Sequence, residues 1–257
     1  MKVAASDYDG TLFRQNNISE EDIIGIHKWR EAGHLFGVVT GRDYGMLAPQ
    51  LRYYGIKFDY AVCNNGGIIC RQDGGVLWQA RIATALLQQI LEIAGVRESL
   101  HLAFSAADRT FLCHERDGSW ITREATAWNF PLVKIQEREI PWLPQIHQVS
   151  LGYEDSAKAE AVSETINVRY GRDIHAYPNR GSVDITPYGI SKKQGIQQMI
   201  ELMGWQDIVI YAIGDEINDL PMIEAFGGFT VDTARDAIKA KARGVYAGVG
   251  AMLEANI

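Results

Sequence analysis

Two aspartates stand two positions apart near the N-terminus, in the stretch VAASDYDGTLF at residues 3–13. Asp7 and Asp9 follow a run of small and apolar residues, so both carboxylates come at the end of an expected buried strand. Like charges at this spacing resist joint ionisation, and burial raises the cost for each of them. Either a cation or a basic side chain offsets their charge, or the stretch is a solvent-exposed turn.

Polar residues follow three other apolar segments in the same way. They are Thr40, Gly41 and Arg42 in LFGVVTGR, Asn64 and Asn65 in YAVCNNGG, and Asp215, Asn218 and Asp219 in DIVIYAIGDEIND. Ligands of open α/β sheets bind at the carboxyl ends of the strands, so we expect these residues to share one site. A polar turn and a substrate or cap contact are equally plausible for Asn64 and Asn65. For Arg42, a salt bridge at the strand end is slightly favoured over substrate binding.

The order of the surrounding segments predicts how these residues are positioned. Residues 2–7, 35–42 and 60–67 are expected strands, and helices capped by Ser19 and closed by Gly55 lie between them. This alternation favours a parallel sheet. From about residue 75 the order becomes that of an antiparallel α+β unit, with 82–95 helical and 114–145 unassigned. After Pro187 the parallel pattern returns, so the chain ends form one domain around an insert.

The expected site carries an excess of negative charge. Four carboxylates, those of Asp7, Asp9, Asp215 and Asp219, would meet in one cleft. Mg²⁺ is a hard cation that takes oxygen ligands and is typically shared with substrate phosphate, so it would offset this charge. Such a site favours a phosphate ester as substrate.

Each residue type then has a plausible part in phosphoryl transfer. Asp7 is a candidate nucleophile that would form an aspartyl-phosphate. Asp9 is placed to protonate the leaving alcohol and later to activate water. The Thr40 hydroxyl and the Gly41 N–H are donors for phosphoryl oxygens, and Lys192, at a helix start, offers a positive charge.

The motifs DYDGT, TGR, ISKKQG and GDEIND, in this order, resemble those of the haloacid dehalogenase superfamily of phosphotransferases. The resemblance covers the whole chain, and the insert looks like the large cap of Cof-type, class IIB, sugar phosphatases. It implies a Rossmann-like parallel-sheet core, residues 1–78 and 188–257, with an inserted α+β cap domain of type IIB at residues 79–187 that selects the substrate.

The same resemblance assigns roles to individual residues. Asp7 would be the nucleophile and Asp9 the acid and base. Mg²⁺ would be held by Asp7, the backbone carbonyl of Asp9 and Asp215, with Asn218 and Asp219 in support. Phosphate would be bound by Thr40 and Lys192, and we add Gly41, Arg42 and Asn218 to the predicted phosphate- and substrate-binding residues. Lys193 follows Lys192 directly, which leaves a swap between the two lysines open.

We therefore predict a Mg²⁺-dependent phosphatase acting on small phosphorylated metabolites, with sugar phosphates foremost. A phosphomutase would use the same Asp7 and Asp9, and a ligand-sensing protein would keep the fold without turnover. Within the insert, Arg180 in the turn YPNRG is expected to be a solvated hairpin arginine rather than a substrate contact. Trp120, Trp128 and Trp142 are expected in the core of the insert.

Composition narrows the class of partner. The 257 residues carry a net charge of −7, which argues against binding to nucleic acid, since that affinity rests on Lys and Arg. Three cysteines form neither a disulfide framework nor a zinc motif. No apolar stretch of about 18 residues occurs, so neither a signal peptide nor a membrane span is expected. We expect a cytoplasmic monomer or weak homodimer whose partner is a small phosphate ester.

Overall fold

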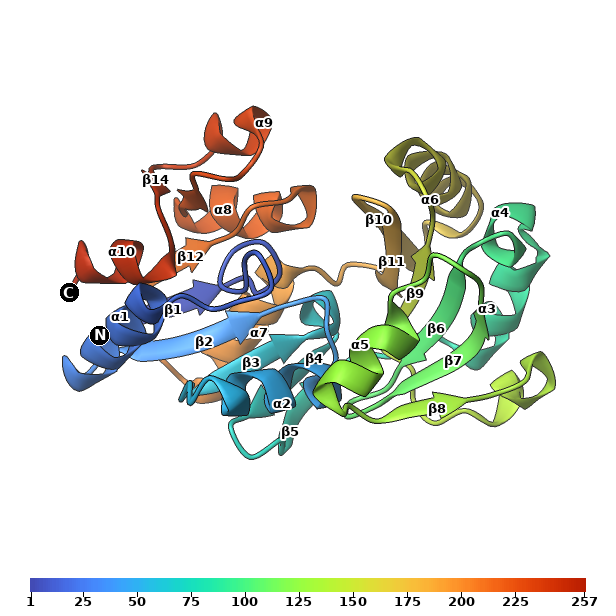
Figure 1. Ribbon diagram of the computed structural model, residues 1–257, viewed down its shortest axis with the longest axis horizontal. Helices are drawn as coiled ribbons and strands as arrows, with labels where there is room; N and C mark the ends of the chain where they lie inside the picture. The colour runs from blue at the N-terminus through green and yellow to red at the C-terminus, as the bar shows by residue number, and fades with distance from the viewer.

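Two six-stranded sheets lie beside each other in the computed structural model, which describes residues 1–257 (Figure 1). The first sheet has the order β12-β1-β2-β3-β4-β5 and draws strands from both ends of the chain. Its strands are β1 (Lys2–Ser6), β2 (Leu35–Val39), β3 (Tyr60–Cys63), β4 (Ile68–Arg71), β5 (Val76–Gln79) and β12 (Val209–Ile213). The β12, β1, β2 and β3 strands pair in parallel, as expected, whereas β4 and β5 add an antiparallel hairpin that the sequence patterns did not predict.

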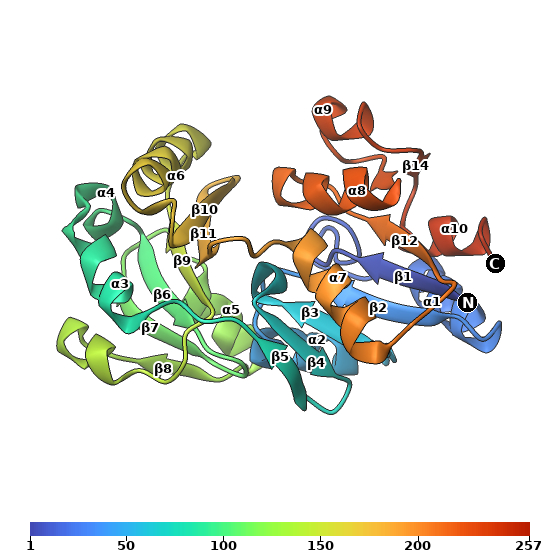
Figure 2. The ribbon, with the colours of Figure 1, turned by 180° about the vertical axis from the view of Figure 1, so that it is seen from behind.

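Helices cover both faces of this sheet, because its central strands are apolar on both sides. Buried side chains of α1 (Glu20–Glu31), α2 (Tyr44–Tyr53) and α10 (Val249–Glu254) pack on one face. Those of α7 (Lys192–Met203) and α8 (Leu220–Phe226) pack on the other, which faces the viewer in Figure 2. The α9 helix (Asp236–Lys239) and the short strands β13 (Thr230–Val231) and β14 (Val245–Tyr246) follow α8. The layers are those of a Rossmann-like core.

The insert forms the second sheet, in the order β10-β11-β9-β6-β7-β8. Its strands are β6 (His101–Ser105), β7 (Thr110–Glu115), β8 (Leu132–Lys134), β9 (Gln148–Gly152), β10 (Ile174–Asn179) and β11 (Ser182–Pro187). All pairs are antiparallel except β7 with β8. One face is apolar and packs under α3 (Thr84–Gln89), α4 (Ala94–Arg97) and α6 (Ser156–Tyr170). The opposite face turns towards the first sheet.

Two expectations for the insert are wrong in detail. Residues 82–95 do not form one helix: α3 ends at Gln89, and a 3₁₀ turn over Ile90–Glu92 precedes α4. The Trp142 side chain is 85% exposed and so lies outside any core. The segment left unassigned contains α5 (Ile121–Trp128), β8 and a 3₁₀ helix over Glu137–Trp142.

The chain passes from the first sheet to the second between β5 and α3 and returns between β11 and α7. The proposed domain limits, 1–78 with 188–257 and 79–187, stay a prediction that fits this division into sheets. Buried hydrogen bonds join the two units, among them Thr110 Oγ1 to Asp43 Oδ2 at 2.6 Å and Asn64 Nδ2 to the Ala106 carbonyl at 3.1 Å. None of the helices has the length and apolar character needed to cross a membrane.

Candidate active site

A buried lysine joins the two ends of the chain at the carboxyl edge of the first sheet. Lys192 Nζ donates to Asp7 Oδ1 at 2.5 Å and to Asp219 Oδ1 at 2.6 Å. Asp7 directly follows β1, and Asp219 lies in the 3₁₀ helix over Ile217–Asp219 after β12, the strand that pairs with β1. Lys192 is the first residue of α7, whose N-cap is Ser191. The parallel register of β1 and β12 therefore brings residues about 200 positions apart into contact.

Burial and like charge perturb this cluster. Burial raises the pKa of Asp7 well above its ordinary value; repulsion from Asp219 and Asp215 adds to the shift and Lys192 opposes it. Burial alone would lower the pKa of Lys192, but Asp219 and Asp7 raise it. The lysine is 2% exposed and is therefore held as a cation between two carboxylates. Such perturbed groups concentrate at functional sites.

Asp215 is the third carboxylate of the cluster, and both of its oxygens have partners. Thr11 Oγ1 donates to Oδ1 at 2.8 Å, and Arg180 Nη2 donates to Oδ2 at 2.8 Å. Gly10 has a φ of +89°, and a Cβ there would overlap the Asp215 carboxylate, so the turn after Asp9 needs a glycine. Burial raises the pKa of Asp215, and repulsion from Asp219 adds to this.

The Asp9 side chain does not belong to the cluster of the other three carboxylates. Its two oxygens accept from Nη2 and Nε of Arg42, both at 2.7 Å, and its side chain is 48% exposed. Arg42 Nη2 also lies 2.6 Å from Glu124 of α5, in the insert. The salt bridge favoured for Arg42 is present, and it connects Asp9 to the cap. A metal contact from Asp9 would therefore come from its backbone carbonyl, as the resemblance implies.

The remaining candidates lie around these charges. Thr40 is fully buried, and its hydroxyl accepts from the Arg42 N–H at 3.1 Å, which leaves the hydroxyl proton free to donate. Asn218 Nδ2 donates to Asn65 Oδ1 at 3.1 Å, and Asn218 Oδ1 is buried without a partner. The structure brings Lys192, rather than Lys193, to the carboxylates.

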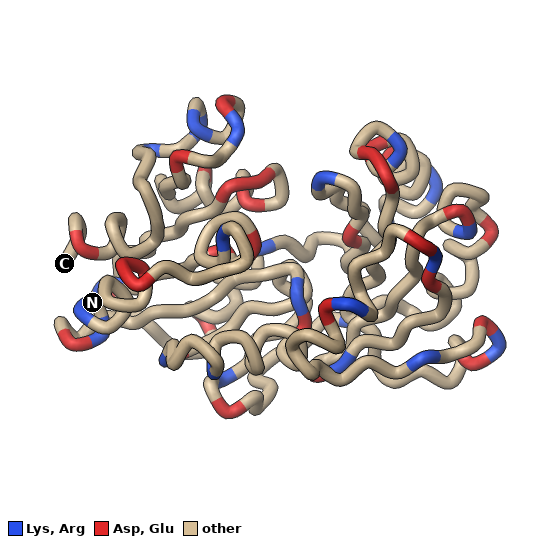
Figure 3. The backbone as a smooth tube through the Cα atoms, viewed as in Figure 1, with Lys and Arg blue, Asp and Glu red and all other residues tan.

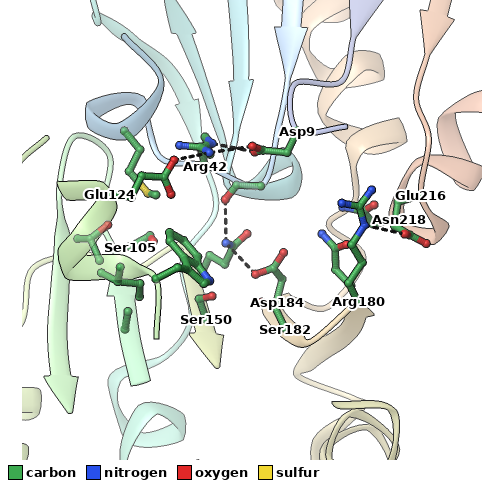
Figure 4. A pocket seen from close by; sticks show the side chains of 18 of the residues that line it. Asp9, Arg42, Ser105, Glu124, Ser150, Arg180, Ser182, Asp184, Glu216 and Asn218 are labelled. Carbon is green, nitrogen blue, oxygen red and sulfur yellow. Dashed lines mark hydrogen bonds and ion pairs between the residues drawn. The ribbon is translucent and has the colours of Figure 1, made fainter. Parts of the chain in front are cut away.

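A cavity of about 330 Å³ opens between the two sheets over this cluster (Figure 4). Asp7, Asp9, Gly41, Arg42, Lys192 and Asn218 line it from the core. From the cap it is lined mainly by small or polar side chains of β6, β9 and β11 and by Arg180. The cavity gives a substrate access to Asp7 from beneath the cap.

The carboxylates fit a divalent cation. One oxygen each of Asp7, Asp215 and Asp219 lies within 4.8 Å of the others, and all three residues are buried. Two of these acids contact Lys192 and the third contacts Arg180, so the three acids outnumber their two basic partners. The excess negative charge suits a hard cation with oxygen ligands. The donor set thus matches Mg²⁺.

The expectation for Arg180 is confirmed only in part: the side chain is 61% exposed at a hairpin turn, but it is paired with acids of the core. The turn between β10 and β11 carries it across the interface, where its Nε also lies 3.3 Å from Glu216 Oε2. Figure 3 shows this basic hairpin tip facing the acidic stretch that follows β12. Sequence reasoning found Arg180 only as a weak candidate, because its partners depend on how the cap docks.

Four other residues of the site were not identified from the sequence. They are Thr11, Glu124, Gln148 and Asp184. Thr11 belongs to the motif DYDGT, and Asp184 is an acid within the expected strand SVDITP, so the sequence contained a pattern by which each could have been identified. Nothing in the sequence distinguishes Glu124 and Gln148, since polar residues are common in helices and at the start of strands.

A Rossmann-like sheet with a carboxylate–lysine site at its carboxyl edge, covered by a cap, is typical of hydrolases that act on phosphate esters. A family model for haloacid dehalogenase-like hydrolases matches residues 4–248, and the chain belongs to this family. The predictions of the family, of the fold class and of an enzyme of the phosphatase type are thereby confirmed.

Named relatives are phosphatases. The chain is 25% identical over 255 residues to pyridoxal phosphate phosphatase YbhA of Escherichia coli K12, covering 94% of this chain and 91% of that protein. It is 23% identical over 255 residues to 5-amino-6-(5-phospho-D-ribitylamino)uracil phosphatase YitU of Bacillus subtilis 168, covering 91% and 88%. The fold is similar to that of the subclass IIB sugar phosphatase BT4131, with a TM-score of 0.74 and 18% identity over 100% of this chain and 96% of the other.

Proposed function

We propose that this chain is a Mg²⁺-dependent phosphatase that hydrolyses small phosphorylated metabolites, sugar phosphates among them, through an aspartyl-phosphate on Asp7. The observation that carries the proposal is the contact of Lys192 with both Asp7 and Asp219 at the wall of a capped polar cavity. Buried ion pairs are weak stabilisers, since desolvation offsets much of their attraction. A chemical role explains the placement of these groups better than a structural one.

The reaction would proceed in two displacements. An Asp7 oxygen attacks phosphorus, the bond from phosphorus to the ester oxygen breaks, and Asp9 gives its proton to the leaving alkoxide. Water then attacks the aspartyl-phosphate, Asp9 takes the water proton, and inorganic phosphate leaves with Asp7 restored. Asp9 lines the same cavity as Asp7, and its exposed side chain has room to turn from Arg42 to the leaving group.

The other residues would hold charge and geometry. Lys192 neutralises Asp7 against an approaching dianion, and the Thr40 hydroxyl, the Gly41 N–H and Asn218 bind the phosphoryl group. Asp7, Asp215, the Asp9 carbonyl and, in support, Asp219 would hold Mg²⁺, which when bound neutralises charge on the transferring group. Arg42 orients Asp9 and contacts the cap through Glu124.

The relatives suggest which substrates to try first. Pyridoxal phosphate is the compound in the name of the first phosphatase above, and phosphorylated sugar alcohols resemble part of the compound in the name of the second. We include them with sugar phosphates and nucleotides in one panel.

The test is a phosphate-release screen over this panel with Mg²⁺. Asp7→Asn and Lys192→Ala should each lose at least about 100-fold in kcat/KM, because they remove the nucleophile or its cation. Lys193→Ala is the matched control and should retain the wild-type rate. Full turnover by Asp7→Asn, or no phosphate release from any ester, would refute the proposal. Transfer of phosphate between sugar positions that depends on a bisphosphate activator, in place of release of inorganic phosphate, would favour a mutase instead.

A further inference from the structure

The cap wall of the cavity is built from alternate residues of three neighbouring strands. Ala103 and Ser105 of β6, Gln148 and Ser150 of β9, and Ser182 and Asp184 of β11 line it, while the residues between them point to the apolar side of the sheet. Ser150 pairs in register with both Ala103 and Asp184, so these side chains form one continuous surface. This surface offers hydroxyls, one amide and one carboxylate, and the strands supply no Lys or Arg to it.

The cations that line the cavity already have acidic partners. Lys192 is shared by two aspartates, Arg42 contacts Asp9 and Glu124, and Arg180 contacts Asp215 and Glu216. A second anionic group on a substrate would meet cations whose charge is already balanced by carboxylates, and only Nη1 of Arg42 is without a partner. The lining as a whole has five acids (Asp7, Asp9, Glu124, Asp184, Glu216) against three cations, a balance of −2.

Asp184 is the acid that has no basic partner. It is 7% exposed, and it accepts from Asn65 Nδ2 at 3.0 Å and from Gln148 Nε2 at 3.4 Å (Figure 4). Burial raises the pKa of Asp184 to about 6, so the group is ionised at pH 7.5. A carboxylate that faces a cavity and has no salt-bridge partner attracts hydrogen-bond donors and positive charge and repels anions.

A second unpaired acceptor lies on the opposite wall. Asn218 Oδ1 is buried and has no partner, although Asn218 is only 6% exposed and lines the cavity. Buried polar atoms are rarely left unpaired, so this oxygen is available to a donor on a ligand. Asp184 and Asn218 Oδ1 therefore both offer acceptors to a ligand, and Arg42 Nη1, which is also buried without a partner, is the one free donor among the charged side chains of the lining.

We propose that the leaving group of the substrate carries hydroxyl or ammonium donors and no second anionic group, and that Asp184 is the residue that enforces this specificity. The inference rests on the proposed phosphatase function and narrows its substrates to monophosphates of neutral or aminated polyols. It disfavours bisphosphates and phosphorylated sugar acids, and with them a mutase that works through a bisphosphate.

Matched esters test this directly. Fructose 6-phosphate and fructose 1,6-bisphosphate differ by the second phosphate, and glucose 6-phosphate and glucosamine 6-phosphate by one amino group. The wild type should prefer fructose 6-phosphate over the bisphosphate by about 100-fold in kcat/KM, since like charges at such contacts cost several kcal/mol. It should hydrolyse glucosamine 6-phosphate at least as well as glucose 6-phosphate.

Asp184→Asn keeps the shape of the side chain and removes its charge. It should reduce the preference against the bisphosphate at least about 10-fold and lower the relative rate with glucosamine 6-phosphate. Asp173→Asn removes the same charge from an exposed position of the insert and should leave both ratios unchanged. Asp184→Ser replaces Asp184→Asn if thermal unfolding shows that the latter does not fold.

The outcomes separate the inference from the function. Equal rates with the mono- and bisphosphate, or ratios that Asp184→Asn does not move, overturn the inference while phosphatase activity stands. Hydrolysis of p-nitrophenyl phosphate but of none of the sugar esters also overturns it. If no ester at all is hydrolysed, the proposed function fails and the inference fails with it.

Discussion

Arg180 and a divalent cation would compete for the same oxygen of Asp215. Arg180 donates to Oδ2 at 2.8 Å from the tip of the β10–β11 hairpin, and Asp215 is one of the three clustered acids. Arg180 has a φ of +53°, a conformation that Asn or Gly adopts more readily. The contacts of its side chain therefore explain an arginine at this position better than the turn conformation does. We therefore predict that Arg180→Ala binds Mg²⁺ or Mn²⁺ more tightly than the wild type in the absence of substrate.

The magnitude follows from burial and distance. Asp215 is 4% exposed at its side chain, but the Arg180 side chain is 61% exposed, so water screens the pair. The interaction free energy of such a pair is about 1 kcal/mol, towards the upper end of the range for exposed salt bridges. Loss of the competitor should then lower the Kd of the cation about five-fold.

Isothermal titration with Mn²⁺ measures this affinity without turnover. Arg235→Ala is the matched control, because Arg235 lies 2.9 Å from Glu216 but makes no contact with Asp215. It removes the same charge close to the site without freeing the Asp215 oxygen. Its Kd should change less than two-fold.

Two results would refute the reasoning. The first is a Kd for Arg180→Ala that is unchanged or higher than that of the wild type, which would mean that Arg180 does not compete with the cation. The second is equal tightening in Arg180→Ala and Arg235→Ala, which would point to general electrostatics rather than competition at Asp215.

Three further predictions concern stability and the position of Asp215. Gly10→Ala should lower the free energy of unfolding by more than about 1 kcal/mol and weaken Mn²⁺ binding, because its φ is +89° and a Cβ would overlap Asp215; unchanged affinity would contradict the assignment of Asp215. Thr110→Val should cost about 1–3 kcal/mol in urea unfolding, since it removes the 2.6 Å hydrogen bond to buried Asp43; a change within 0.5 kcal/mol, a tolerance typical of inert surface substitutions, would contradict this. For Asp184, burial raises the pKa from 3.8 to about 6, so the folded state binds the proton more tightly and loses stability as pH rises from about 4 to above 6. Asp184→Asn lacks this loss, and its unfolding free energy relative to wild type should rise by up to roughly 3 kcal/mol between pH 4 and pH 8; a difference independent of pH would refute the shift.

Much of the core could be predicted because its signals are local. An apolar run followed by a polar turn identifies the end of each parallel strand, as at Asp7 and Asp215. The topology of parallel strands then brings such ends together without further information. The β4–β5 hairpin escaped prediction because each strand has only four residues, which is too short for an alternating pattern to be recognised.

The broken helix at 82–95 shows a limit of periodicity. Its residues are good helix formers with apolar spacing, yet α3 stops at Gln89 and the chain turns. Packing of Leu87, Ile90 and Val96 into the cap core decides the path there. Tertiary contacts outweigh propensities of a few tenths of a kcal/mol per residue.

The residues of the candidate site could be predicted from the sequence: the acids, the lysine and the strand ends that carry them follow from residue type and alternating pattern. Only the tertiary structure decided what surrounds these residues. The Arg180–Asp215 pair, the Arg42–Glu124 contact and the exposure of Asp184 to the cavity depend on how one folded unit docks on another. Docking is set by the fit of two completed surfaces, and that fit has no period along the chain.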